Sequence, residues 1–522
     1  MAAVAEMEFG LFVNGETVEP ADGEVRELLE PATGKPLARA AMAGAEDIDR
    51  AVAAARAALG GSWGKTPPNE RSRLLHALAD AIAANRKELT ELETRNVGKA
   101  IMSVKGEVAV SVEYLRWYAS ALGTIAGRAT PIGGSILSYT LKEPVGVCAQ
   151  IVPWNYPIML ATWKLAPALA AGCTVVLKPD PATPLTALRL AQLAVEVGIP
   201  PGVVNVVPGD GPTTGARLVS HPDVDKVAFT GSTQTGGEIM RLSSEPLKRI
   251  SLELGGKSPS VVFADANLDD AIPSSVWSIY YSAGQSCEAR SRILVEQPIY
   301  EDFVARFAEA AGRLKVGDPL DAETQMGSLI SAAHRDKVHR FVEVGREEGA
   351  EIVAGGESPN GNGSFYPPTV LAKVATTVDR ISGGRVDIGM GAGWWVEEHR
   401  THGFPFPPTA ERMQMLEEQL EIVHGLLTEE PFSFAGAHYR LDECRFAFKP
   451  VQQPHPPIVL GGKGGPRISR LAARWADEFN TVGGTPGEVR RRFERVRQAV
   501  ERQDGPELPT DAHLHRLQPE LR

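Results

Sequence analysis

Short β-branched runs alternate with helical stretches after Pro144, and this alternation constrains the fold more than any other feature of the chain. The expected strands cover 145–152, 174–177, 203–207, 226–230, 252–254 and 261–263, and the expected helices cover 163–171, 185–197, 213–219 and a stretch from Gln234. Strands joined through helices run parallel in one sheet, so the pattern predicts an α/β fold with crossover helices. Such sheets bind ligands beyond the carboxyl ends of their strands, and glycine turns there are the first candidate sites.

Two further regions flank this part of the chain. Ala- and Leu-rich stretches with helical spacing predict an N-terminal helical layer over 45–59, 70–92 and 107–122. After residue 375 a second strand-to-helix system is expected, with strands at 386–391 and 457–460, a helix over 409–427, and a helix from the glycine run 461–465 through Asp477. The charged tail after residue 485 is expected to hold one helix and a frayed end.

The composition excludes several classes of protein. A chain of 522 residues is too long for one hydrophobic core, so roughly two to four domains are expected. The net charge of −11 argues against nucleic acid as a partner, because affinity for phosphates comes from clustered Lys and Arg. The four cysteines form no Cys-x-x-Cys pair, so no metal site or disulfide framework is expected, and a cytoplasmic protein fits. No signal peptide and no membrane span are expected.

Three glycine turns follow expected strands. The turn at 209–215 is one residue longer than the dinucleotide-binding spacing, and Asp210 would repel a pyrophosphate if it pointed inward, so an ordinary turn is equally well supported. The turn at 231–236 lacks the middle glycine, but its hydroxyl and N–H groups can still meet a phosphate at a helix N-terminus. Residues 255–258 imitate the end of a Walker A loop, yet Ser251 stands where that motif needs Gly, which excludes an NTPase.

Three residues have the chemistry of a catalytic site. Cys287 lies between small and polar residues after an expected helix, although a free cysteine is more often inert core. Glu253 ends a strand ahead of two glycines, although a capping or ion-paired glutamate explains it as well when it is taken alone. Asn155 lies between Pro153 and Pro157 after a strand, where it has no strong structural explanation. The interpretation therefore depends on the three residues together.

Asn155, Glu253 and Cys287 follow one another at spacings of 98 and 34 residues, and in this order and spacing the chain resembles the aldehyde dehydrogenase superfamily. The resemblance runs from about residue 12 to residue 374. Further matching segments are 163–167 (Trp-Lys-Leu-Ala-Pro), 177–179 (Leu-Lys-Pro), 229–232 (Phe-Thr-Gly-Ser) and 317–319 (Gly-Asp-Pro). The resemblance implies a helical layer and a Rossmann-type dinucleotide-binding domain over 1–253, followed by a catalytic domain over 254–374.

The resemblance implies NAD(P)-dependent oxidation of a small-molecule aldehyde to a carboxylic acid, through a thiohemiacetal and a thioester on Cys287. The developing oxyanion needs hydrogen-bond donors, and the resemblance implies that the Asn155 amide and the backbone N–H of Cys287 supply them. Glu253, tuned by burial, would activate the hydrolytic water, and Lys164 matches the family's proton-relay lysine. The implied cofactor contacts are Ile151, Val152, Pro153, Trp154, Lys178, Gly211, Gly215, Phe229, Gly231, Ser232 and Leu254.

Cofactor and substrate are less constrained. In many NAD-specific relatives a glutamate three residues after the lysine matched by Lys178 binds the adenosine ribose, and here that residue is Pro181. Without the carboxylate a ribose 2′-phosphate is not repelled, so NAD or NADP is expected, with NAD favoured. The overall texture is nearest to amino-aldehyde and betaine-aldehyde dehydrogenases. Candidates for an aromatic pocket, or equally for core, are Trp154, Tyr156, Trp163 and Trp277.

The resemblance stops after residue 374. The family continues with a Glu-Ile-Phe-Gly-Pro motif that holds the nicotinamide ribose, a Pro-Phe-Gly-Gly stretch and a strand that joins subunits, and none of these follows here. The part of the chain after residue 374 resembles the luciferase-like flavin or deazaflavin oxidoreductases. The segments that match are 379–385, 389–394, 449–452 and 456–462. That family folds as a TIM barrel, in which a glycine turn such as 461–465 binds cofactor phosphate.

The second part is too short for a whole barrel, because 148 residues follow residue 374 and a barrel needs roughly 250. We expect a partial barrel over 375–485 and a charged tail over 486–522. The simplest explanation is a fusion of two incomplete genes, either natural or produced by an assembly error. Three hypotheses stay open: an aldehyde dehydrogenase impaired by truncation, a flavin- or deazaflavin-dependent oxidoreductase on the second part, and an inactive remnant that binds dinucleotide. A homo-oligomer also stays open, although the strand that joins subunits is missing.

Overall fold

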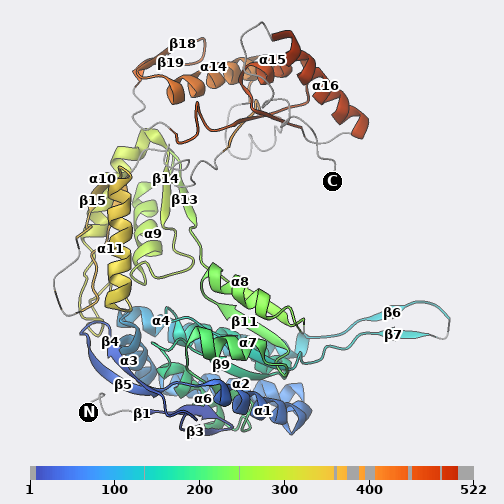
Figure 1. The fold of residues 1–522 in the computed structure, drawn as a ribbon, viewed down its shortest axis with the longest axis vertical. Coiled ribbons are helices and arrows are strands. Elements are labelled where there is room, and N and C mark those ends of the chain that lie inside the picture. The colour runs from blue at the N-terminus through green and yellow to red at the C-terminus, as the bar shows by residue number, and fades with distance from the viewer. Residues whose placement is uncertain are drawn as a thin grey trace. The chain divides into compact units, whose positions relative to one another are not determined.

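A computed structural model of the chain describes residues 8–134, 136–245, 247–357, 361, 363–372, 387–393, 406–444, 450–481 and 485–503. The chain divides into two compact units, Met1–Ala372 and Lys373–Arg522. Figure 1 shows their helices and strands, coloured from blue at the N-terminus to red at the C-terminus.

A seven-stranded sheet forms the centre of the first unit, in the order β12-β11-β8-β9-β10-β2-β3. Its strands are β2 (Leu11–Val13), β3 (Glu16–Val18), β8 (Val147–Ile151), β9 (Thr174–Lys178), β10 (Val204–Val206), β11 (Lys226–Thr230) and β12 (Arg249–Glu253). The strands β8 to β12 are parallel, as the sequence predicts, and β2 pairs antiparallel with β10. The carboxyl ends of β8, β9, β11 and β12 therefore lie at one edge of the sheet.

Helices cover both faces of this sheet (Figure 1). They are α1 (Ala45–Gly60), α2 (Pro68–Ala84), α3 (Arg86–Val97), α4 (Ile101–Ala121), α5 (Pro157–Ala171), α6 (Leu185–Glu196), α7 (Ala216–Ser220) and α8 (Thr233–Leu242). Alternate residues of β8 enter different cores: Val147 and Ala149 pack with α1 and α7, whereas Cys148 packs with α2, α4, α5 and α6. Burial on both faces explains why these strands are continuous apolar runs.

The expected helix over 70–92 is two helices. Asn85 ends α2 and precedes α3, with φ −96° and ψ 16°, and its Nδ2 donates to Ala81 O at 2.9 Å. An asparagine side chain competes for backbone carbonyls in this way, and the apolar periodicity on either side does not reveal the break.

Small strands near the N-terminus were not predicted. β1 (Glu8–Phe9), β4 (Val25–Glu30) and β5 (Lys35–Ala41) form a three-stranded sheet. β6 (Ala129–Pro131) and β7 (Leu137–Tyr139) pair as a hairpin that projects from the first unit (Figure 1). Most of these strands are short and largely exposed, so they carry little of the apolar pattern by which strands are recognised.

The remainder of the first unit is smaller and open on one side. Its elements are β13 (Pro259–Val262), α9 (Leu268–Tyr280), β14 (Arg292–Val295), α10 (Tyr300–Gly312), α11 (Ala332–Glu347), β15 (Glu351–Ala354) and β16 (Val370–Ala372). The parallel pair β13–β14 packs one face on α9 and α10, whereas Val261, Phe263 and Leu294 are 55%, 56% and 48% exposed. Parallel sheets are normally covered on both faces, and the described residues cover only one here.

The second unit contains a three-stranded parallel sheet in the order β17-β20-β21. Its elements are β17 (Ile388–Met390), α14 (Thr409–Thr428), β18 (Phe432–Ala435), β19 (Arg440–Cys444), β20 (Ile458–Gly461), α15 (Pro466–Trp475), β21 (Glu478–Asn480) and α16 (Pro486–Gln503). The core lies between this sheet and the helices α14, α15 and α16. The strands in the described part of this unit do not close into a barrel, so the partial barrel stays a prediction.

Part of the luciferase-like resemblance lies outside the described residues, namely 379–385, Trp394 and Lys449. The glycine turn at 461–465 lies inside them and follows β20 directly. Over the ranges that the structure describes, every helix is too short or too polar to cross a membrane.

Replacement by alanine is expected to have opposite effects on stability at Gly98 and at Gly106. Gly98 ends α3 with φ +81°, and a Cβ there would lie 2.2 Å from Ser328 Oγ. Gly106 lies inside α4, where a Cβ would meet nothing within 4 Å. We expect Gly98→Ala to lower the free energy of unfolding by about 1–3 kcal/mol and Gly106→Ala to raise it by about 0.5–1 kcal/mol, measured by urea unfolding. Equal unfolding midpoints for the two variants would contradict this expectation.

Candidate active site

Asn155 lies just beyond β8, in the segment that leads into α5. Pro157 is the first residue of α5, where a missing N–H costs nothing, so the helix starts directly after the asparagine segment. Asn155 Nδ2 donates to the backbone oxygen of Gln285 at 2.8 Å, and Asn155 Oδ1 is buried with no partner in the described part of the chain. Because Nδ2 carries two hydrogens, one of them stays available to a ligand oxygen.

Cys287 lies in the loop that follows α9. Ala283 and Gly284 both have positive φ, 51° and 75°, and this conformation turns the chain away from the helix axis. Gln285 Oε1 accepts from Ile330 N at 3.0 Å, which anchors the loop two residues before the cysteine. Cys287 is exposed, so its thiol can meet a ligand.

The surroundings of Cys287 keep its thiol protonated at rest. Partial burial raises the pKa of the thiol, and the neighbouring carboxylates of Glu288 and Glu253 raise it further. Backbone N–H groups of Cys287 and Glu288 act in the opposite direction but do not outweigh these effects. A base must therefore remove the proton before the sulfur becomes a nucleophile.

Glu253 is the last residue of β12, the edge strand of the sheet, and pairs in register with Thr230. Its side chain is exposed, so the expectation that burial tunes this carboxylate is wrong. The physical reason is that β12 alternates exposed and half-buried residues, because no described element covers its outer face. The carboxylate affects the pKa of both Cys287 and Lys164, which indicates that it lies near both.

Gly256 brings the chain after Glu253 against the cysteine loop. A Cβ at this position would lie 2.7 Å from the Cys287 backbone oxygen, which is too close for any side chain. Arg292 Nε donates to Lys257 O at 2.8 Å and ties the same segment to β14. The glycines after Glu253 therefore permit a close approach to Cys287.

Lys164 lies on α5 in the same neighbourhood. Burial lowers its pKa to about 8, and the Glu253 carboxylate opposes this shift. Its backbone oxygen accepts from Gln150 Nε2 at 2.7 Å, which ties α5 to the central strand β8. An amine with a pKa near 8 can both take and release a proton near neutral pH.

The expected cofactor residues lie at or near the carboxyl ends of the parallel strands, where such sheets bind ligands. Ile151, Val152, Pro153 and Trp154 end or follow β8, Lys178 ends β9, Gly211 and Gly215 bound the turn after β10, Phe229, Gly231 and Ser232 end or follow β11, and Leu254 follows β12. The Trp154 ring meets His334 edge-on at 5.1 Å. Leu254 packs against Gly236 in α8, where a Cβ would lie 2.7 Å from Leu254 Cδ2.

Lys178 is buried and fastens the ends of two strands. Its Nζ donates to Pro179 O at 3.0 Å and to Gly209 O at 2.8 Å. Burial lowers the pKa of this lysine to about 8, and the carboxylates of Asp180 and Asp210 oppose the shift. The ammonium therefore holds the turn after β10 beside the end of β9.

The sequence left open whether Asp210 points inward, where it would repel a pyrophosphate. In the structure its carboxylate is bound to its own turn. Its Oδ1 accepts from the N–H groups of Thr213 at 2.8 Å and Thr214 at 3.2 Å. Those N–H groups are consequently occupied, so the turn that contains Gly211 and Gly215 has fewer free donors for a phosphate.

The turn after β11 is better suited to an anion. Ser232 caps α8 by accepting from Thr235 N at 3.1 Å, and this leaves the earlier N–H groups of the first turn free for a ligand. Gly231 lies under the Phe229 ring, where a Cβ would be 2.4 Å from Phe229 Cζ. Any larger residue at 231 would displace the ring or the turn.

The four aromatic residues expected as candidates for a pocket each pack against different neighbours. Trp163 stacks on Tyr114 at 5.3 Å, and Trp277 packs on Tyr281 at 4.5 Å. Tyr156 is buried, with 4% exposed. A shared aromatic pocket for the aldehyde therefore stays a prediction.

Two residues of the site were not predicted. Gln285 receives the Asn155 hydrogen bond, and Lys99 Nζ donates to the Asn155 backbone oxygen at 2.7 Å. Their partners lie 130 and 56 residues away in the chain, and no local pattern marks such contacts. Only the position of Gln285, two residues before Cys287, could have drawn attention to it.

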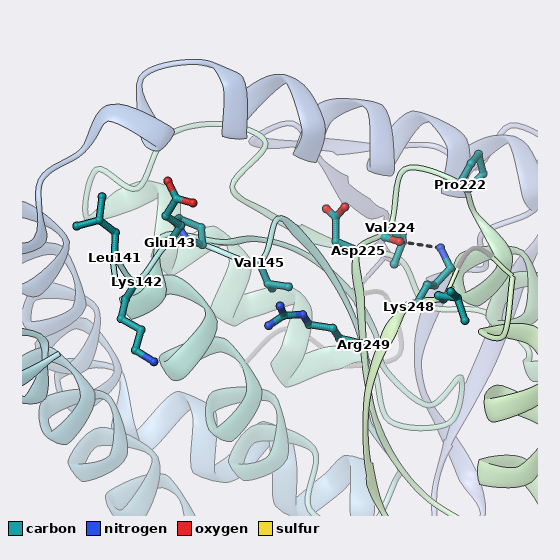
Figure 2. Close-up of a pocket in the computed structure, with 11 residues that line it drawn as sticks. Leu141, Lys142, Glu143, Val145, Pro222, Val224, Asp225, Lys248 and Arg249 are labelled. Atoms are coloured by element: carbon teal, nitrogen blue, oxygen red, sulfur yellow. Dashed lines mark hydrogen bonds between the residues drawn. The ribbon is translucent and has the colours of Figure 1, made fainter. Parts of the chain in front are cut away.

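A polar cavity of about 580 Å³ lies at the opposite end of the sheet (Figure 2). Val145 and Asp225 precede β8 and β11, and Arg249 begins β12, so these lining residues mark the amino ends of the strands. Lys248 Nζ in its wall donates to Val224 O at 2.7 Å, as Figure 2 shows. This cavity is separate from the candidate active site.

Two known families match the chain. Residues 18–381 match the Aldehyde dehydrogenase family, and residues 362–514 match the Luciferase-like monooxygenase family. An aldehyde dehydrogenase of Emericella nidulans is 43% identical over 372 residues, which cover 71% of this chain and 75% of that protein. Human aldehyde dehydrogenase 1A1 is 44% identical over 368 residues, which cover 70% of this chain and 74% of that protein.

Solved structures are similar to the same part of the chain. The NAD-dependent aldehyde dehydrogenase from Sinorhizobium meliloti has a TM-score of 0.70 at 39% identity and covers 72% of this chain and 76% of its own. The NAD+ complex of an aldehyde dehydrogenase from Bacillus cereus has a TM-score of 0.71 at 39% identity and covers 79% and 88%. Together with the family match, these similarities confirm the sequence resemblance. The chain belongs to the aldehyde dehydrogenase family and carries a luciferase-like domain in its C-terminal part.

Proposed function

We propose that the chain oxidises an aldehyde to a carboxylic acid with NAD(P) as the electron acceptor. The observation that carries the proposal is the junction of three segments around the cysteine loop. Asn155 Nδ2 is hydrogen-bonded to that loop, and Gly256 allows the segment after Glu253 to touch the Cys287 backbone. A nucleophile, a carboxylate and an amide donor that meet in this way are the parts that acyl transfer requires.

Cys287 supplies the nucleophile. Because its pKa is raised, the thiol keeps its proton until a base removes it, and the sulfur then attacks the carbonyl carbon of the aldehyde. The new C–S bond turns the carbonyl oxygen into an oxyanion, for which the free hydrogen of Asn155 Nδ2 and the Cys287 N–H are the donors. One donor of this kind contributes about 100- to 1000-fold to kcat.

Glu253 and Lys164 move the protons. Glu253 accepts the proton of Cys287 and later that of the water that attacks the thioester, whose C–S bond then breaks to release the acid and restore the thiol. The amine of Lys164, with its pKa lowered to about 8, relays protons from this carboxylate. Exposure of Glu253 keeps the carboxylate in contact with solvent water.

The chain also has groups that fit a dinucleotide. The N-terminus of α8 behind Ser232 and the buried ammonium of Lys178 both favour phosphate oxygens. These residues would hold NAD(P)+, which would supply the hydride acceptor that the oxidation needs. Because the Bacillus cereus relative is an NAD+ complex, NAD is the favoured cofactor.

Cys287→Ala tests the proposal directly. We expect aldehyde-dependent NAD(P)H formation to fall by at least about 1000-fold, because no other exposed side chain of the site can form the thioester. Cys444→Ala is the matched control, since Cys444 lies in the second unit and should leave the rate unchanged. Equal rates in Cys287→Ala and the parent would contradict the proposal. Protection by NAD against thermal unfolding with no turnover would favour an inactive remnant instead.

Pro181→Glu tests the basis of cofactor choice. A carboxylate three residues after Lys178 would accept from the adenosine ribose hydroxyls and repel a 2′-phosphate, so we expect the ratio of kcat/KM for NAD to that for NADP to rise by about tenfold or more. Ala182→Glu adds the same charge at an exposed neighbouring residue and should change the ratio much less. An unchanged ratio in Pro181→Glu refutes this explanation.

A second candidate function is supported in the second unit. A cavity of about 1080 Å³ is lined by the glycine turn after β20, together with Lys463 and Arg412. The turn leads into α15, whose N-cap residue, Gly465, has no side chain to occupy the first N–H groups. We propose that this cavity binds the phosphate of a flavin or deazaflavin.

Lys463→Met tests this second site. Flavin mononucleotide and a deazaflavin cofactor are titrated into the full chain, and quenching of their fluorescence measures binding. We expect Lys463→Met to weaken binding by about tenfold through loss of one phosphate contact, whereas Arg470→Met, which changes an exposed cation on α15, should not. If neither compound binds the parent chain at millimolar concentration, the second site is refuted.

A further inference from the structure

A buried ion pair lies beneath the asparagine segment. Lys99 and Glu107 have side chains that are 3% and 2% exposed, and Lys99 Nζ lies 2.6 Å from Glu107 Oε1. Glu107 Oε2 has no partner in the described part of the chain. Burial of two charges carries a desolvation penalty that an ion pair offsets only when its other polar atoms are also satisfied. This pair is therefore a weak source of stability.

The same lysine holds the segment that carries the oxyanion amide. Lys99 Nζ donates to the Asn155 backbone oxygen at 2.7 Å and lies 3.5 Å from the centre of the Tyr156 ring. Three residues further, Ile158 N donates to Glu93 Oε1 at 3.0 Å, and Glu93 is also buried. Two buried charged side chains thus hold backbone atoms on both sides of Tyr156.

We propose that Lys99, held by Glu107, is a positioning residue that sets the direction of the Asn155 amide toward the aldehyde oxygen. The inference rests on the proposed aldehyde oxidation. With the backbone oxygen of Asn155 bound to Lys99 and one hydrogen of Nδ2 bound to Gln285 O, the second hydrogen of Nδ2 has a fixed direction. Lys99 itself is 4% exposed, so it acts through Asn155 and does not touch the substrate.

The energetic reason is preorganisation. An oxyanion donor stabilises the transition state only if it already lies where the charge develops, and a misplacement of about 1 Å costs about 100-fold in rate. Without the ammonium, the Asn155 carbonyl and Glu107 would lose a charged partner, and the segment between β8 and α5 would lose one of the contacts that fix its orientation.

Lys99→Met removes the ammonium and keeps a side chain of similar length. Because it leaves Glu107 buried and unpaired, Lys99→Met/Glu107→Gln is made as well, which removes both charges together. Lys105→Met is the matched control, since Lys105 lies on α4 and, among the residues that the structure describes, its Nζ is hydrogen-bonded only to the Met102 sulfur, at 3.5 Å. The measurements are kcat, KM for NAD, and hydrogen exchange of the backbone over 153–159.

In both Lys99 variants we expect kcat to fall by about 10- to 100-fold while KM for NAD changes less than about twofold, because Lys99 holds Asn155 and Tyr156, which are not among the expected cofactor contacts. Hydrogen exchange should rise over 153–159 and stay at the parent level in β9 and β10. Lys105→Met should match the parent in every measurement.

The inference would be overturned if the double variant folds and its kcat and its hydrogen exchange over 153–159 both equal those of the parent. Exchange that rises throughout the first unit would overturn it too, because Lys99 would then act on the fold as a whole. If the parent shows no turnover that depends on Cys287, the proposed function fails, yet exchange over 153–159 still decides whether Lys99 positions Asn155.

Discussion

The hydrogen bond from Asn155 Nδ2 to Gln285 O is the contact on which the candidate site depends. It joins the end of a central, fully buried strand to the loop that carries Cys287. Because β12 is parallel to the central strands, Glu253 reaches the same edge of the sheet. The residues proposed for aldehyde oxidation are thus brought together by the common direction of these strands and by one side-chain contact that crosses to the loop.

Electrostatics within the proposed site follow from the unequal burial of its members. Partial burial and two carboxylates raise the pKa of Cys287, whereas burial and the nearby charge of Lys226 lower the pKa of Lys164. The thiol therefore becomes a weaker acid, whereas the ammonium becomes a stronger acid with a pKa nearer to neutral pH. Glu253 links the two, because it opposes the shift of the lysine while it adds to that of the cysteine.

The sequence predicts the sheet well and the contacts around it poorly. Strands buried on both faces are continuous apolar runs, so β8, β9 and β11 were found nearly to the residue. The break at Asn85 was missed because it depends on one side-chain hydrogen bond. Burial of Glu253 was wrong because burial is set by what packs over a strand, and that information is not local. The role inferred for Lys99 depends on partners that only the folded chain brings together.

The exposed face of the β13–β14 pair affects cofactor binding and the chemical step of the proposed reaction differently. The proposed dinucleotide contacts come from the seven-stranded sheet, whose two cores are closed by helices on both faces. Glu253 and Cys287 are exposed, and so is Val261, which lies on a strand that begins six residues after Glu253. Phe263, directly after that strand, is exposed as well. Oxyanion donors and ion pairs are weaker where water reaches them. The proposed chemical step is therefore more open to water than the proposed cofactor site is.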